Sequence, residues 1–385
     1  MTDDLRARFP HTERMAYLDH ASTGPLSQPV MDAVAAHLQQ RHATQPNNYF
    51  DIAPTLERGR ERIAQVLGTR VERAEYAPNT SYALNVLAHG LGWQPGDRIA
   101  VPGCEFPANV FPWRSLEAQG VAIDFIPTER GTFSLDAVAA TLRPETRLVA
   151  VSWVQFLSGF RADLAALADL VHDRGALFSV DAIQGVGAVP INVEALGIDF
   201  LACGGHKWLM GMQGVGFFYV TEALQARLKP QLGWLNGPVD WENLTAYDTT
   251  LHDDAMRFRL GTLNTAGIVA LDAALGVYLD VGPDAAWQHI QTLTGRLANG
   301  LDALGLPRYG SRDPDERAGI VTVAPDEVGQ DAEALYEALA AEGIMTAVRD
   351  RKLRFAPSYT NTMDEVERAL DVLGVTLGTS TMVAQ

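Results

Sequence analysis

Residues 176–181 read Ala-Leu-Phe-Ser-Val-Asp, and this short run decides the fold class. It is apolar at most positions and ends in a carboxylate, which is typical of a strand buried on both faces of a sheet. Helical patterns such as 81–91 and 161–172 separate it from similar runs. The other candidate strands are Arg98–Val101, Ala122–Ile126, Leu148–Val154, Phe200–Cys203 and Gly216–Val220. Strands that alternate with helices predict an α/β domain built around a mostly parallel sheet.

The pattern changes after about residue 260. Helical periodicity covers 284–304, 331–342 and 364–373, with short strand candidates near 319–323 and 353–356. This mixture predicts a smaller α+β domain. We therefore expect a large domain over residues 16–260 and a small domain formed by residues 1–15 and 261–385.

Composition narrows the class of protein. The 385 residues are 47% hydrophobic and 20% charged, and the net charge is −17. An acidic chain without a basic patch argues against nucleic-acid and anionic-membrane binding. Cys104 and Cys203 are too few for a disulfide framework or a cysteine metal cluster, so we expect no metal. Without an apolar leader or a run of about 18 apolar residues, the expected location is the cytoplasm.

Lysine is rare in this chain and occurs only at positions 207, 229 and 352. Lys207 lies in the run Cys203-Gly-Gly-His-Lys-Trp208, which follows a candidate strand. Asp181 ends another strand, and ligands in such sheets bind beyond the carboxyl ends of the strands. Lys207 as a plain surface lysine and Asp181 as a helix cap are the ordinary alternatives. An amine facing a carboxylate instead suits pyridoxal 5′-phosphate (PLP), because the amine forms a Schiff base and the carboxylate pairs with the pyridinium nitrogen.

Other candidate site residues each have an ordinary interpretation beside the functional one. Asn79-Thr80-Ser81 precedes a helix and predicts either a simple N-cap or a phosphate site. Phe106 follows a strand and is either core or a partner that stacks on a cofactor ring. Gln184 and His206 are either structural hydrogen-bonding residues or cofactor contacts. Arg354 is either solvated or the bidentate partner of a substrate carboxylate.

Together these pieces resemble the class V aminotransferase family of fold type I PLP enzymes. That family includes cysteine desulfurases, selenocysteine lyase-like proteins, kynureninase and isopenicillin N epimerase. The resemblance runs from Tyr17 to Asn361 and is most specific in residues 179–184, SVDAIQ, and 205–208, GHKW. It implies that Lys207 is the Schiff-base lysine and Asp181 the pyridinium partner. It also implies that Gln184 lies near the phenolic oxygen of the cofactor and His206 near its phosphate.

The same resemblance assigns further segments. Residues 79–81 look like the phosphate loop, and residues 105–113 like the segment that stacks on the ring. Thr262, in the run 261–265, belongs to a segment that in the family reaches a neighbouring subunit's phosphate, which implies a homodimer with shared sites. Arg354 and the run 359–366 look like the substrate-carboxylate motif. Gln155 stands at the nearest match to an asparagine that the family often places over the cofactor oxygen.

Three departures from the family limit what it implies. Phe106 stands where cysteine desulfurases stack a histidine. The segment 345–353 contains no cysteine, whereas desulfurases carry a mobile nucleophilic cysteine before the carboxylate arginine. We therefore expect no persulfide on a protein cysteine. Gly204 replaces a serine two residues before His206, which removes one expected phosphate contact.

The sequence thus predicts a PLP enzyme that acts at the α-carbon of a small-molecule substrate, an amino acid. Lys207 is the expected base, Asp181 supports the cofactor ring and Arg354 holds the substrate carboxylate. Transamination is the first expectation. A β-lyase of the cysteine, selenocysteine or kynureninase type is the close alternative, followed by an epimerase. A non-catalytic PLP-binding protein is a further alternative from a different class.

Overall fold

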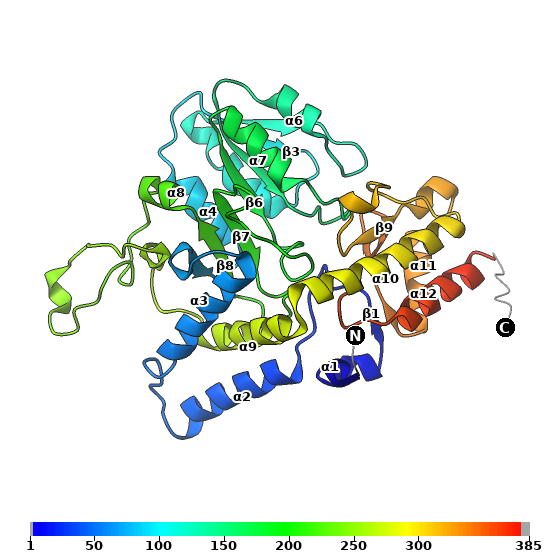
Figure 1. Cartoon of the computed structure of the whole chain (residues 1–385), viewed down its shortest axis with the longest axis horizontal. Coiled ribbons are helices and arrows are strands. Elements are labelled where there is room, and N and C mark those ends of the chain that lie inside the picture. The colour runs from blue at the N-terminus through cyan, green and yellow to red at the C-terminus, as the bar shows by residue number, and fades with distance from the viewer. Residues whose placement is uncertain (1–2, 379–385) are drawn as a thin grey trace.

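The computed structural model describes residues 3–378, and a seven-stranded sheet forms the centre of its large domain (Figure 1). The strand order is β2-β8-β7-β6-β5-β3-β4. Strand β8 is antiparallel to both neighbours and the other pairs are parallel. The strands are β2 (Ala74–Ala77), β3 (Arg98–Pro102), β4 (Ala122–Ile126), β5 (Thr146–Ser152), β6 (Leu177–Asp181), β7 (Phe200–Gly204) and β8 (Gly216–Val220). The predicted α/β class is confirmed, with β2 as an additional strand.

Both faces of this sheet are buried, which explains why its strands are apolar throughout. Along β8, Phe217 and Tyr219 join one hydrophobic cluster, while Phe218 and Val220 join another on the opposite face. Helices cover the two faces (Figure 1). They are α3 (Ala53–Leu67), α4 (Thr80–Gly90), α5 (Phe111–Arg114), α6 (Leu135–Thr141), α7 (Leu164–Asp173), α8 (Glu222–Arg227) and α9 (Thr265–Val281). Helix α2 (Gln28–Ala43) packs on α9, away from the sheet (Figure 1).

The small part of the molecule has its own sheet and core. Three antiparallel strands are arranged in the order β11-β12-β9, and β1 pairs in parallel with β10. The strands are β1 (Ala16–Tyr17), β9 (Val321–Val323), β10 (Ile344–Met345), β11 (Ala347–Arg349) and β12 (Lys352–Phe355). The helices are α1 (Asp3–Ala7), α10 (Pro283–Ala303), α11 (Ala332–Ala341) and α12 (Met363–Thr376). Residues of α10, α11, α12, β9 and β12 share one cluster.

The chain leaves the large core between α9 and α10, which meet at 77°. Residues of α9 lie in the large cluster, while Leu293 to Leu301 of α10 lie in the small one. The domain limits expected from the sequence stay a prediction, and residues 1–2 and 379–385 of the expected small domain lie outside the described part. Within residues 3–378 no single helix is long and apolar enough to span a membrane. Helices α9 and α10 have the required length and composition only when taken together, and the chain bends by 77° between them.

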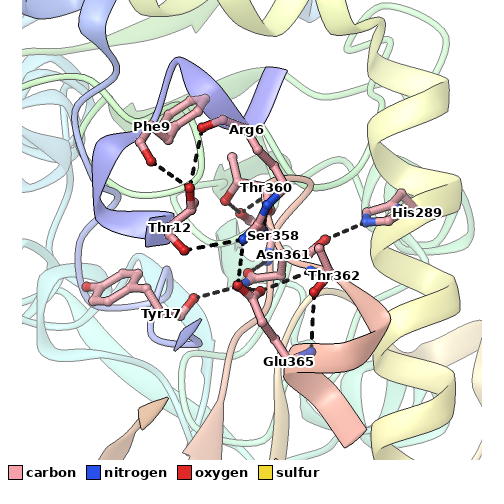
Figure 2. A network of polar contacts seen from close by, with 10 residues as sticks. All are labelled: Arg6, Phe9, Thr12, Tyr17, His289, Ser358, Thr360, Asn361, Thr362 and Glu365. Carbon is pink, nitrogen blue, oxygen red and sulfur yellow. Dashed lines mark hydrogen bonds and ion pairs between the residues drawn. The ribbon is translucent and has the colours of Figure 1, made fainter. Parts of the chain in front are cut away.

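A polar network fastens the N-terminal segment to the C-terminal helix (Figure 2). Glu365 accepts hydrogen bonds from Arg6 at 2.9 Å, from Asn361 at 2.8 Å and from the Thr362 backbone at 3.0 Å. Thr362 and Glu365 also form the capping box of α12. Asn361 donates to the Tyr17 carbonyl at 3.1 Å. The run 359–366 therefore holds the two ends of the chain together next to β12.

Candidate active site

A cavity of about 410 Å³ lies beyond the carboxyl ends of β5 and β6. Residues of the large sheet and residues of β11 and β12 both line it. Nine of the residues singled out in the sequence are in its wall: Asn79, Thr80, Ser81, Phe106, Asp181, Gln184, His206, Lys207 and Arg354. Ser22, Ser152 and Phe156, which the sequence did not single out, also line it, as does Arg349. The cavity therefore brings together side chains that are far apart in the sequence, such as Ser22 and Arg354, which are 332 positions apart.

Asp181 ends β6, and Lys207 follows the adjacent strand β7. The Asp181 side chain is only 2% exposed, and it accepts a hydrogen bond from the Ile183 backbone at 3.0 Å. Burial raises the pKa of Asp181 to about 6, while the Ile183 bond and the charge of Lys207 oppose the shift. Burial lowers the pKa of Lys207 to about 8, and Asp181 again opposes it. Each group thus stabilises the charged form of the other in a site that disfavours charge.

The N-terminus of α4 provides a place for an anion. Asn79 caps this helix by accepting from the Tyr82 backbone at 2.9 Å. The Thr80 hydroxyl is buried and has no hydrogen-bond partner, and it lines the cavity. An unpartnered buried hydroxyl beside free backbone N–H groups favours a phosphate. A Cβ on Gly204 would lie 3.0 Å from Ile183 and 3.2 Å from His206, so that position has little room for the serine of the family.

These features fit PLP. A carboxylate suited to the pyridinium nitrogen, an amine of lowered pKa and an anion site at a helix N-terminus line one cavity. Burial and the charge of Lys207 lower the pKa of His206, so the imidazole is neutral at neutral pH. The Lys207 Nζ lies 5.9 Å from the centroid of the Phe106 ring, which places that ring over the lysine.

Two aromatic rings form one wall, and one of them was missed. Phe106 and Phe156 meet edge to face with 5.2 Å between centroids. Gln155, expected near the cofactor oxygen, does not line the cavity: it is 1% exposed and donates to Glu105 at 2.7 Å. Phe156, the next residue, lines the cavity instead. The chain turns after β5 so that Gln155 points inward and Phe156 faces the site.

A buried carboxylate lies directly behind this wall. Glu105 accepts hydrogen bonds from the Ser152 backbone at 2.6 Å, from the Ser152 hydroxyl and from Gln155. Burial raises the pKa of Glu105 to about 7, and these donors oppose the shift. Because Phe106 follows Glu105 and Ser152 lines the cavity, this cluster fixes two elements of the wall. The sequence feature that could have indicated this cluster is the position of Glu105, a charged residue between β3 and the aromatic residue Phe106.

Arg354 of β12 faces the cavity from the small domain. Its Nη1 donates to the Phe156 carbonyl at 2.8 Å, and its Nη2 donates to Ser22 at 2.8 Å and to Asp19 at 3.1 Å. The side chain is 3% exposed, and its Nε has no partner. Arg349, at the end of β11, donates to the same Ser22 hydroxyl at 3.3 Å. Two guanidinium groups therefore lie on one side of the site.

Of three other residues, Gln184 lines the cavity, whereas Thr262 and His20 lie outside its wall. The Gln184 amide donates to the Ala21 carbonyl and accepts from Trp208, both at 2.9 Å. Thr262 lies in a separate surface cavity of about 350 Å³. His20, which lies close in sequence to Ser22, is fully buried, and burial lowers its pKa to about 3.

The cysteines lie outside the cavity wall. Burial raises the pKa of Cys104 to about 12, and it raises that of the fully buried Cys203 as well. Asp350 and Arg351 alone connect β11 to β12, each with positive φ. This is a two-residue hairpin turn, and neither of its residues is a cysteine. Among residues 3–378 no group of three histidine, cysteine or carboxylate side chains is placed to hold a metal.

Comparisons with known proteins agree on one family. The sequence model described as "Aminotransferase class-V" matches residues 16–349. The chain is 31% identical over 328 residues to a probable cysteine desulfurase of Methanothermobacter thermautotrophicus, covering 83% of this chain and 80% of the relative. An apo cysteine desulfurase from Thermococcus onnurineus NA1 superposes with a TM-score of 0.88 at 27% identity, covering 99% of each chain. A variant of C-DES with glycine covalently linked to its PLP cofactor gives a TM-score of 0.89 at 22% identity, covering 97% and 99%, and so shares the fold.

Proposed function

Since this chain belongs to the class V aminotransferase family of PLP-dependent enzymes, we propose that it is a β-lyase that breaks a carbon–sulfur bond in an amino acid. The observation that carries this choice is the 31% identity to a probable cysteine desulfurase. The relatives thus favour the β-lyase, which was the second expectation from the sequence, over the transaminase, which was the first. Transamination has weaker support, from an uncharacterized aminotransferase of Bacillus subtilis that is 26% identical over 372 residues.

The residues of the cavity suggest how the chain holds its cofactor. Asp181 would pair with the ring nitrogen, Lys207 would hold the aldehyde carbon and Phe106 would lie against the ring. The N-terminus of α4, with Asn79, Thr80 and Ser81, would hold the phosphate, with His206 nearby. When bound, PLP supplies an electron sink for the bonds at the substrate's α-carbon.

The remaining steps belong to side chains of this chain. Arg354 binds the α-carboxylate and so orients the Cα–H bond. With a pKa near 8, Lys207 accepts the α-proton on Nζ at neutral to mildly basic pH. Asp181 keeps its negative charge beside the ring nitrogen. Overall, the Cβ–S bond breaks with its electron pair on sulfur, water takes the place of nitrogen at Cα, and the products are a thiol, pyruvate and ammonium.

The sulfur leaves as a free thiol in this proposal. Cys104 and Cys203 lie outside the cavity wall, and the raised pKa of each thiol opposes thiolate formation. The turn between β11 and β12 carries no cysteine. Transfer of sulfur to a protein cysteine, the step in which desulfurases use their nucleophile, therefore has no residue to perform it.

The test is product analysis of the PLP-loaded protein with L-cysteine and S-substituted cysteines, without added keto acid. We expect pyruvate and thiol in equal amounts, with the cofactor spectrum restored after each turnover. Lys207→Ala should abolish pyruvate formation, whereas Cys104→Ala with Cys203→Ala should keep the rate within about twofold. Accumulation of pyridoxamine phosphate without pyruvate would contradict the proposal and restore transamination.

Three further expectations join this proposal. We propose that the enzyme is a homodimer, with Thr262 reaching the cofactor of the neighbouring subunit, that it works in the cytoplasm, and that its domains divide as the sequence predicts. The separate cavity around Thr262 supports the first of these, since Thr262 does not line the cavity that holds Lys207 of its own chain. Analytical ultracentrifugation that finds a PLP-loaded monomer would contradict the dimer.

A further inference from the structure

We propose that Arg349 binds a second anionic group of the substrate, so that the preferred substrates are S-substituted cysteines with a negative charge beyond the sulfur. This inference rests on the proposed carbon–sulfur lyase function and names its substrate class. It follows from the charges around the cavity and from the side chains that face them.

Two guanidinium groups converge on one side of the cavity. Arg354 and Arg349 both donate to the Ser22 hydroxyl, at 2.8 Å and 3.3 Å, and all three residues line the cavity. Their positions differ in depth. Arg354 is 3% exposed, whereas Arg349 ends β11 and is exposed. A substrate that reaches Arg354 with its α-carboxylate therefore passes Arg349 with its outer end.

The charges of this wall do not balance. Asp19 forms an ion pair with Arg354 at 3.1 Å, and Asp181 faces Lys207. In the described part of the chain no carboxylate lies within 4 Å of the Arg349 guanidinium, although its neighbour Arg351 pairs with Asp326 at 3.7 Å. A chain with a net charge of −17 thus leaves one arginine uncompensated at its active-site cavity. An uncompensated cation at a binding site favours an anionic ligand group.

The aromatic part of the wall suits the middle of such a substrate. Phe106 and Phe156 present rings with no charge and no hydrogen-bond donor. Methylene groups and a thioether sulfur pack well on aromatic rings. Since Phe106 would cover the cofactor ring, the order along the cavity is then an α-carboxylate at Arg354, sulfur against Phe156 and an anion at Arg349.

The competing explanation is that both arginines hold one α-carboxylate. A matched pair of substrates separates the two. S-carboxymethyl-L-cysteine and S-carbamoylmethyl-L-cysteine have nearly the same shape and differ in the charge beyond sulfur. Each has the same α-carboxylate, so only contacts to the outer group distinguish them.

The experiment measures the Kd of both compounds for the PLP-loaded protein, from the change in the visible absorption of the cofactor, and pyruvate release in parallel. We expect the carboxymethyl compound to bind at least about tenfold more tightly, because charge-assisted hydrogen bonds are about twice as strong as neutral ones. The preference should fall as salt concentration rises. Arg349→Gln should remove the preference by weakening the carboxymethyl compound far more than the neutral one, and Arg349→Lys should restore part of it.

Arg351→Gln is the matched control, because it removes an equal charge from the same turn and its side chain is 86% exposed, outside the cavity wall. It should keep the preference. Equal binding of the two compounds, or equal weakening of both by Arg349→Gln, overturns the inference even if pyruvate is released. A preference that depends on Arg349 without any pyruvate release overturns the proposed lyase and keeps the anion site.

Discussion

Arg354 Nη2 donates to Asp19 Oδ1 at 3.1 Å, across 335 positions of sequence. Asp19 follows β1, which pairs with β10, and Arg354 lies on β12. The neighbouring contact between Asp19 and Ala356 is itself a parallel β-bridge. Residues near both ends of the chain thus fix the guanidinium before any substrate arrives. This preorganisation reduces the entropy that substrate binding must offset.

The geometry of Arg354 predicts that lysine cannot replace it. Two guanidinium nitrogens hold Phe156, Asp19 and Ser22 at once, and a lysine ammonium cannot reproduce this fork. We expect Arg354→Lys to raise the Kd of amino-acid substrates about 10- to 100-fold. Titration of the cofactor absorption checks this, and Arg351→Lys provides the control. An unchanged Kd in Arg354→Lys would mean that the α-carboxylate binds elsewhere.

The lowered pKa of Lys207 predicts how cofactor capture depends on pH. Only the neutral amine attacks the aldehyde of PLP, so the rate of uptake by the apoprotein should rise with pH around a midpoint near 8. An exposed lysine would give a midpoint above 10. Asp181 raises the pKa of Lys207, so Asp181→Asn should move the midpoint lower. Stopped-flow absorbance measures both, and a midpoint that rises in Asp181→Asn would contradict the assignment.

Residues at the ends of regular strands were predictable. Asp181 and Lys207 stood out because an apolar run ends in a charge and a rare lysine follows the next strand. The orientations of Gln155 and Phe156 could not be predicted, because an irregular turn after β5 decides which of the two side chains faces the site. A hydrogen bond from the Gln155 backbone N–H to the Phe160 carbonyl closes this turn. Asp19 and Arg349 reach the cavity region only through tertiary contacts. The β11–β12 turn also lacks the glycine that usually signals positive φ.

The raised pKa of Glu105 predicts a stability difference that depends on pH. The unfolded chain releases this proton from about pH 4.5, whereas the folded chain keeps it until about pH 7. Between these values the folded state binds more protons, so this group lowers the free energy of unfolding as pH rises. Glu105→Gln has no titrating group at this position, so its free energy of unfolding does not fall for this reason. The melting temperature of Glu105→Gln, measured relative to that of the wild type, should therefore increase from pH 4.5 to 7. A constant difference across this range would show that Glu105 does not titrate there.

The network around Glu365 predicts a large cost for removing one carboxylate (Figure 2). Glu365 is 6% exposed and binds Arg6, Asn361 and the Thr362 backbone, so Glu365→Ala leaves a guanidinium and an amide without their partner. We expect a loss of about 3 kcal/mol in the free energy of unfolding. Thr362→Ala removes only the cap of α12 and should cost about 1 kcal/mol. Urea unfolding of both variants provides the comparison. Equal losses would mean that the capping box, and not the link between the two chain ends, accounts for the role of Glu365.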